Sequence, residues 1–167
     1  MRKFCLVFAL LCLGVAKANA VQTIAMTTNN QIVCTGQTSN SITLTSWSWG
    51  TTDIGISPSG TGGKVTLSQV MVSKAFDGCS PAMLKIYFGD GRLGTVLIEQ
   101  KKTQGTTALP VAEVTLTNAV IAAYTVGGSS SNAASETWAL SFDKVCVTTY
   151  GVTATGASQA GTTVCYE

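Results

Sequence analysis

The chain has 167 residues with ten basic residues, eight acidic residues and no histidine. The absence of histidine removes the commonest general base and the Ser-His and Cys-His nucleophile pairs. The acidic residues are too scattered to indicate the close carboxylate pair of a glycosidase. The basic residues do not cluster as a nucleic-acid-binding face requires. We therefore expect neither an enzyme nor a nucleic-acid-binding protein.

The first twenty residues have the pattern of a secretory signal peptide. Two basic residues precede an uncharged apolar run of about a dozen residues, and Ala18-Asn19-Ala20 is a small-x-small cleavage site. The run is too short to remain as a membrane-spanning helix. We expect residues 1–20 to be cleaved. Residues 21–167 then form a single domain, periplasmic, extracellular or on the cell surface, with a net charge of 7 − 8 = −1.

Four cysteines remain after the signal peptide: Cys34, Cys79, Cys146 and Cys165. In an exported chain they predict two disulfides, and three pairings are open. Cys146 lies on the strand face opposite Val145 and Val147, so it could bridge subunits, although a bond within the chain is favoured. A zinc site is disfavoured because the chain has no Cys-x-x-Cys pair and no histidine. No metal or cofactor is expected.

The first predicted strands cover residues 23–28 and 41–49. Ile42 and Leu44 lie on one face of the second strand, whereas Trp47 and Trp49 have the other sequence parity. Because side chains alternate along a strand, this change of phase predicts a β-bulge near Thr45 or Ser46.

Gly50 ends the tryptophan strand, and residues 51–63 are rich in glycine and include Pro58. This composition predicts a long irregular loop, of a length that is usually functional or disordered. Residues 64–74 resume an apolar alternation, with a second change of phase between Leu67 and Val70.

A short helix is predicted from Ser80-Pro81, with Ser80 as the N-cap and the proline in the first turn. Gly89 is the expected stop. The spacing predicts one apolar face that packs on the sheet: Met83, Leu84, Tyr87 and Phe88.

Further strands are predicted after the helix, with a third change of phase between Phe142 and Val145. Bulges bend strands, and small closed barrels use them to close the sheet. The fold class is therefore mainly β: a small closed β-barrel of two curved antiparallel sheets, one flanking helix and a long protruding loop. The later segments are strands at 94–102 and 136–150, one or two strands within 109–126 interrupted near Asn118, a polar connection at 103–108, a mobile loop at 127–131 and a closing strand at 164–166.

The ordered motifs resemble the Hcp (haemolysin-coregulated protein) family, the tube-forming protein of bacterial type VI secretion systems. The resemblance covers residues 41–150, about three quarters of the chain after the signal peptide. It is carried by these motifs, in order: Trp47-Ser48-Trp49-Gly50, Gly63-Lys64-Val65, Val72-Ser73-Lys74 with Asp77, Ser80-Pro81, and the strand from Glu136 to Tyr150.

The resemblance implies a structural protein that forms hexameric rings, which stack into a hollow tube. It also implies that residues 51–63 contact neighbouring subunits while Trp47 and Trp49 anchor the loop at its base; the tryptophans are equally well explained as core residues. The expected partners are further copies of the chain, secretion-machinery components and small cargo in the lumen. The expected assembly residues are Trp47, Trp49, Gly50, Ile54, Ile56, Pro58, Gly60 and Gly63.

A signal peptide and four cysteines depart from a family that is assembled in the cytoplasm. We therefore expect an exported variant, stabilised by disulfides, that builds a ring, tube or fibre outside the inner membrane. The alternative is a secreted monomeric module that binds glycans or host surfaces through exposed aromatic side chains.

Overall fold

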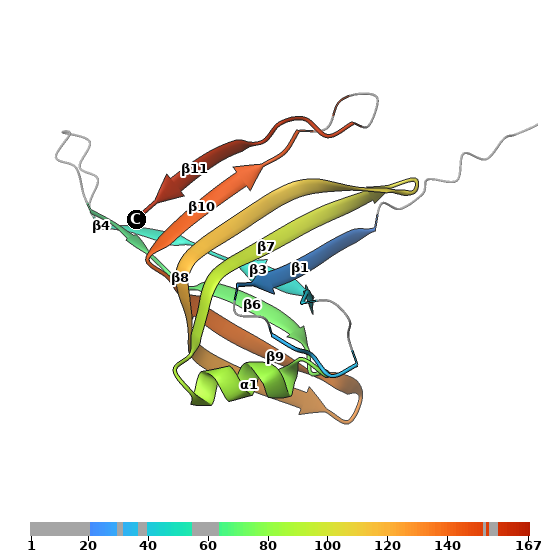
Figure 1. Cartoon of the computed structure of the whole chain (residues 1–167), viewed down its shortest axis with the longest axis vertical. Helices are drawn as coiled ribbons and strands as arrows, with labels where there is room; N and C mark the ends of the chain where they lie inside the picture. Colours follow the sequence, from blue (N-terminus) through green and yellow to red (C-terminus); the bar gives the residue numbers. More distant parts are fainter. Residues whose placement is uncertain (1–20, 30–31, 37–39, 55–63, 152, 154–156) are drawn as a thin grey trace, which may run out of the picture.

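The computed structural model describes residues 21–29, 32–36, 40–54, 64–151, 153 and 157–167. This part of the chain is built from antiparallel strands and one short helix (Figure 1). The elements are β1 (Gln22–Thr28), β2 (Ile42–Leu44), β3 (Ser46–Ser48), β4 (Thr51–Ile54), β5 (Lys64–Leu67), β6 (Val70–Ala75), α1 (Ser80–Phe88), β7 (Arg92–Gln104), β8 (Thr107–Ser129), β9 (Asn132–Ser141), β10 (Lys144–Thr149) and β11 (Thr162–Tyr166).

One large antiparallel sheet contains all of these strands except β4 and β5. Its hydrogen-bonded path runs β2-β1-β7-β8-β9-β6-β3, and β10 joins β8 outside this path and carries β11. The long strand β8 pairs with β10 through its first half and with β9 through its second half. The change of partner follows Asn118, which has a left-handed φ of 52°. Asn118 is therefore the interruption that the sequence predicted, inside one strand.

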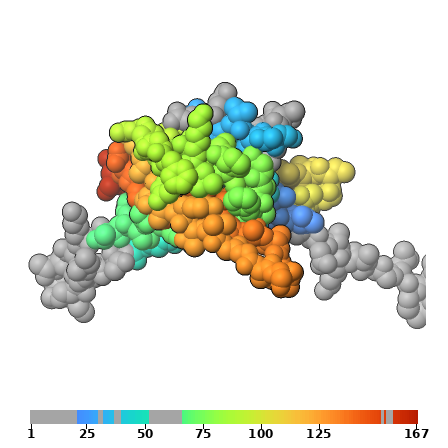
Figure 2. Space-filling model, turned by 90° about the horizontal axis from the view of Figure 1, so that it is seen from below, coloured from blue at the N-terminus to red at the C-terminus, as the bar shows by residue number. Residues whose placement is uncertain are grey.

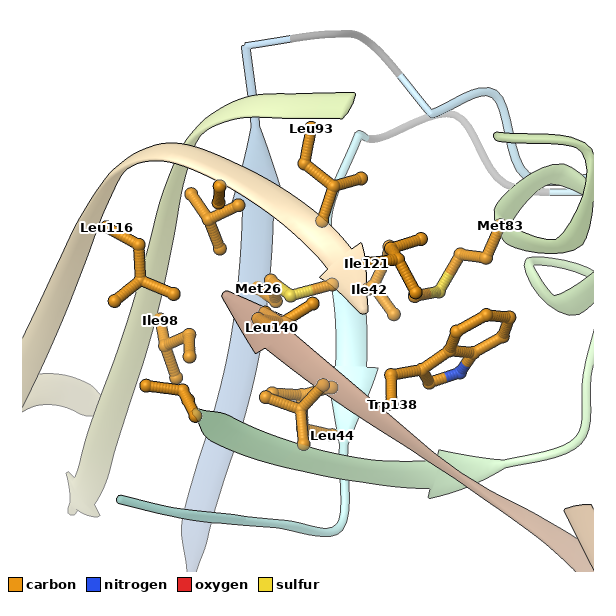
Figure 3. Packing of buried hydrophobic residues seen from close by; sticks show 14 of the residues in the cluster. Met26, Ile42, Leu44, Met83, Leu93, Ile98, Leu116, Ile121, Trp138 and Leu140 are labelled. Atoms are coloured by element: carbon orange, nitrogen blue, oxygen red, sulfur yellow. The ribbon is translucent and has the colours of Figure 1, made fainter. Parts of the chain in front are cut away.

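The core lies on the concave side of this curved sheet (Figure 3). Methionine, valine, isoleucine and leucine side chains from β1, β2, β7, β8 and β9 point toward one another there. Trp138 on β9 lies beside Met83 of α1, and both are fully buried. The helix thus covers the end of the core next to β9. Figure 2 views the molecule from below Figure 1 and shows both elements on that face.

The three predicted changes of phase coincide with strand breaks. β2 and β3 are separated at Thr45, β5 and β6 at Ser68 and Gln69, and β9 and β10 after Ser141. At each break the chain exchanges one pairing partner for another, for example β1 for β6 at Thr45. The phase changes follow from the need to keep apolar side chains on the concave face while the strand turns.

The architecture is a strongly curved, mainly antiparallel sheet with one helix. The hydrogen bonds between its strands do not run around a complete ring. The path is open, since its ends β2 and β3 do not pair with each other. These ends are nevertheless consecutive in the chain, with Thr45 between them.

Three loop predictions were wrong. Residues 51–54 were expected to be irregular, but they form β4 and pair with β5. Residues 127–129, expected in a mobile loop, extend β8, which turns tightly into β9. The polar connection expected at 103–108 is only the turn at Gly105 and Thr106. In each case pairing with a neighbouring strand outweighs the local preference for a loop.

The helix ends before Gly89 as expected, but it begins one residue earlier, at Ser80, and differs in its cap and its face. Cys79 occupies the N-cap position and makes no side-chain capping bond, while Ser80 is fully buried. Met83 is buried as predicted, whereas Phe88 is 77% exposed. Phe88 is the last helical residue and therefore lies on the surface at the end of α1.

Candidate functional site

β3 (Ser46–Ser48) and Trp49 directly after it pack against the core. Trp47 and Trp49 are partly buried and pack against the hydrophobic core. The Trp47 indole Nε1–H donates to the Gln100 side-chain oxygen on β7, at 3.3 Å. The Trp49 Nε1 is buried with no hydrogen-bond partner among the described residues. Trp47 and Trp49 are therefore packing residues, and Trp49 directly precedes Gly50.

Directly after them, Gly50 and Ser68 join the two ends of the β4–β5 hairpin. The Gly50 N–H donates to the Ser68 hydroxyl at 3.1 Å, and the Ser68 N–H donates to the Gly50 carbonyl at 3.1 Å. From this clamp β4 and β5 run as a separate two-stranded sheet, paired from Thr51↔Leu67 to Ile54↔Lys64. We call β4, β5 and residues 55–63 the arm; β4 lies at the left edge of the molecule in Figure 1.

Part of the predicted assembly set falls on this arm. Gly50 belongs to its base and Ile54 ends β4. The remaining predicted residues lie outside the described part of the chain: Ile56, Pro58, Gly60 and Gly63. The structure therefore brings Trp47, Trp49 and Gly50 together at the arm's base.

A buried charge cluster lies between β6, β9 and the start of α1, and the sequence prediction missed it. The Lys74 and Glu136 side chains are fully buried and form an ion pair, with Nζ to Oε1 at 2.7 Å. The Lys74 amine also donates to the Ala75 carbonyl at 2.7 Å and to Asp77 Oδ1 at 2.7 Å. These acceptors compensate the large cost of removing the charges from water.

Ser80 connects this cluster to the helix. Its hydroxyl donates to Glu136 Oε1 at 2.8 Å, accepts from the Asp77 N–H at 3.0 Å, and lies 3.1 Å from the Lys74 amine. Asp77 in turn accepts from the Cys79 N–H at 2.8 Å. The cluster therefore fixes the turn that starts α1 to two strands of the sheet.

The sequence contained a signal for this cluster. Lys74 shares its parity with the buried Val70 and Val72, and Glu136 shares its parity with the buried Trp138 and Leu140. When two neighbouring strands each carry a charged residue at an inward position, the two residues are expected to form a buried pair. Only the fold establishes that β6 and β9 are neighbours.

An aromatic group extends the cluster toward the surface. The Tyr124 hydroxyl donates to Glu136 Oε2 at 3.3 Å, and its ring centroid lies 4.2 Å from that of Trp138. Burial raises the pKa of Tyr124, and the negative charge of Glu136 adds to this effect. Tyr124 therefore stays a neutral donor that satisfies the second oxygen of Glu136.

The disulfide pairing that the sequence left open is Cys34–Cys79 and Cys146–Cys165. The first bond is buried and ties residues 32–34 to the N-cap of α1. The second joins β10 to β11 at directly opposed positions. Cys146 is therefore bonded within the chain, which is the alternative that the sequence favoured over a bridge between subunits.

The described residues include no group of three or more His, Cys, Asp or Glu side chains that could hold a metal ion. Within the same ranges, no helix is both long and apolar enough to cross a membrane. A shallow groove of about 420 Å³ lies between α1 and the Ile32–Val33 segment. It is open and mostly apolar, with Lys85 and Asp90 as the charged residues of its lining.

Solved structures resemble this fold over most of its length. The crystal structure of Hcp1 from Salmonella typhimurium matches with a TM-score of 0.65 and 22% identity, covering 87% of this chain and 94% of that one. A type six secretion system protein matches with a TM-score of 0.73 and 15% identity, over 85% and 92% of the two chains. A type VI secretion system effector from Yersinia pestis gives 0.64 and 15%, over 86% and 98%.

Among curated proteins, none matches this sequence significantly. The family model described as "Type VI secretion system effector, Hcp" matches residues 33–149. This match spans most of the sheet, the whole arm, the helix and the charge cluster. The chain therefore belongs to the Hcp family of type VI secretion proteins, a structural and non-enzymatic family whose members self-assemble into rings.

Proposed function

We propose that this protein is an exported ring-forming subunit of the Hcp type, whose rings stack into a tube or fibre. Family membership supports self-assembly. The observation that carries the proposal for this chain is the arm: a two-stranded hairpin that pairs with no strand of the main sheet and is clamped at Gly50 and Ser68. An isolated two-stranded hairpin is marginally stable by itself and gains stability when it packs on a neighbour.

The ring in this proposal has six copies, and the arm reaches a neighbouring subunit or the next ring. Such a head-to-tail contact uses two different surfaces and closes by rotation. The contacting residues are Ile54, Ile56, Pro58, Gly60 and Gly63, with Trp47, Trp49 and Gly50 as their rigid support. Secretion-machinery components and small cargo in the lumen are the further partners that the proposal includes.

We also infer that the curved sheet acts as a closed barrel, with the segment from β2 to β3 as its seam. The support is that β2 and β3, the two ends of the hydrogen-bonded path, are joined in the chain by Thr45. The Thr45 N–H donates to the Ser73 carbonyl of β6 at 2.8 Å. A closed seam gives a rigid wall, which a tube subunit requires.

Export is the second part of the proposal. It rests on the signal-peptide pattern of residues 1–20, which we propose are removed, and on the two disulfides, which are typical of proteins outside the cytoplasm. The mature chain then begins at Val21 and works in the periplasm, outside the cell or on its surface.

The test is the mass of the mature protein, residues 21–167, under oxidising conditions, by size-exclusion chromatography with light scattering and by negative-stain microscopy. We expect ring-sized particles with a central hole. A mass corresponding to one chain at all concentrations would contradict the proposal.

That result would favour the alternative, a monomeric secreted binding module. The observation in its favour is the exposure of two aromatic side chains, Phe76 at 49% and Phe88 at 77%. A glycan array with Phe88→Ala as the comparison variant would then test whether the exposed aromatic surface binds sugars.

A further inference from the structure

The last strand of the chain forms one edge of the large sheet. β11 pairs with β10 only, and all five of its residues are exposed. Its two large apolar side chains, Val164 and Tyr166, each remain 50% exposed. Burial therefore contributes little to holding β11 in place.

The polar contacts of β11 are also at the surface. The Thr148 and Thr163 hydroxyls are 2.8 Å apart, and Lys144 forms an ion pair with Glu167. Exposed pairs of this kind contribute little stability. The strongest link between the two strands is the Cys146–Cys165 disulfide.

The two disulfides differ in their access to solvent. Cys34 is 2% exposed and Cys79 is fully buried, whereas Cys165 is exposed and Cys146 is half-buried. Reduction begins when a thiolate attacks a disulfide sulfur, so its rate depends on access. A mild dithiol should therefore open Cys146–Cys165 while Cys34–Cys79 remains intact.

Release of β11 would uncover the outer edge of β10. From Val145 to Thr149 this strand has no charged or proline residue, the features that natural proteins use to protect a sheet edge. Val145 and Val147 lie opposite Tyr166 and Val164 and would lose that cover. The segment whose register fits this edge is β11 itself, and every copy of the chain carries one.

We propose that β11 is a releasable edge strand latched by the exposed disulfide, and that the uncovered edge of β10 binds β11 of a second copy. Dithiothreitol opens the latch in two thiol–disulfide exchanges, which give two protein thiols and the cyclic disulfide of the reductant. Oxidised glutathione re-forms the bond between Cys146 of one copy and Cys165 of the other, with release of two reduced glutathione molecules. The inference does not depend on ring formation.

Release is tested by amide hydrogen exchange of the full mature chain with and without dithiothreitol. We expect exchange of the β11 amides to accelerate about 30-fold or more, corresponding to about 2 kcal/mol, while β1 and β7 are unchanged. Alkylation and peptide mass spectrometry verify which disulfide opened. The variant Cys146→Ser/Cys165→Ser should reproduce the effect without reductant. β11 amides that stay protected in both cases would overturn the latch.

Exchange between copies is tested with two single variants of different tag size, Cys146→Ser and Cys165→Ser. When they are mixed and oxidised with glutathione, the retained Cys165 of one copy meets the retained Cys146 of the other. We expect disulfide-linked heterodimers to make up a clearly larger fraction of all dimers than random pairing of the two variants would give. Heterodimers at or below the random share, measured on non-reducing gels, would overturn the pairing of β11 between copies.

Discussion

Lys74 is the residue on which three elements of this fold converge. It lies on β6, pairs with Glu136 on β9, and contacts Asp77 and Ser80 at the start of α1. A buried ion pair adds little net stability, but the loss of one partner leaves an uncompensated buried charge. Lys74 therefore matters mainly for the geometry that it imposes on the helix.

This role predicts a large effect of Lys74→Met. We expect a loss of about 3–5 kcal/mol in the free energy of unfolding, because Glu136 would remain buried without its cation. Denaturant unfolding measures this loss. The matched control is Lys101→Met, which removes a partly exposed pair with Glu99 and should cost less than about 1 kcal/mol. Equal losses in the two variants would contradict the interpretation.

Tyr150 gives a prediction on pH. Its hydroxyl hydrogen-bonds to the Glu113 carboxylate, which is the main cause of the raised pKa of Tyr150; burial and the charges of Glu113 and Glu99 add to it. The native state therefore retains a proton that the unfolded chain loses near pH 10.0. The contribution to stability is complete below that pH and is lost as the pH rises through the folded pKa.

We expect Tyr150→Phe to weaken the fall in stability above pH 10.0, measured by denaturant unfolding on both sides of this value. Glu113→Gln should act in the same direction, since it removes the charge that disfavours ionisation. Part of the fall should remain, because the pKa of Tyr124 is also raised. A pH dependence identical to that of the unmodified protein would show that the Tyr150–Glu113 bond has no such effect.

At the scale of the elements, the arm is attached to the main sheet at its base, but its strands do not belong to that sheet. Its strands β4 and β5 pair only with each other, and hydrogen bonds between Gly50 and Ser68 join the two ends of the hairpin. The hairpin is thus closed at its base by hydrogen bonds and, among the described strands, pairs with none of the main sheet.

Replacement of residues 55–63 by an Asn-Gly turn should keep the β4–β5 pairing, since this dipeptide suits a two-residue hairpin. We expect the shortened protein to fold but to form no rings, as judged by circular dichroism and light scattering. The control exchanges Gly105-Thr106, the turn between β7 and β8, for Asn-Gly and should leave assembly unchanged. Rings of normal size from the shortened protein would show that the arm is not the assembly element.

At the scale of the whole molecule, two disulfides stabilise the fold in different ways. Cys34–Cys79 closes a separation of 45 residues and joins the chain's early segment to the helix inside the core. Cys146–Cys165 closes 19 residues and holds only an edge strand.

We therefore expect Cys34→Ala/Cys79→Ala to lower the free energy of global unfolding by about 4 kcal/mol. The matched variant Cys146→Ser/Cys165→Ser should lower it less, because β11 can detach while the rest stays folded. Thermal and denaturant unfolding compare the two variants. The opposite order would contradict the assignment of the first bond to the core and the second to the edge.

Much of the strand pattern could be predicted from local residues. The alternation of apolar side chains located most of the strands, and the changes of phase at Thr45, between Leu67 and Val70, and after Phe142 located the breaks between them. Pro81 and Gly89 marked the helix, because a proline in the first turn and a glycine after the last turn are local signals.

Pairing between distant segments could not be predicted in the same way. Four features depend on which strands become neighbours: the extension of β8 through Gly127, the strand at residues 51–54, the Lys74–Glu136 pair, and the choice among three disulfide pairings.

The sequence by itself thus determined the strand periodicity, the cysteine count and the family, because these are written in local order and motif spacing. Only the tertiary structure decided what the charged and sulfur-bearing side chains contact. The reason is physical: a charge or a thiol is satisfied by whichever group the fold brings within a few ångströms, and that group can be 62 residues away, as it is for Lys74.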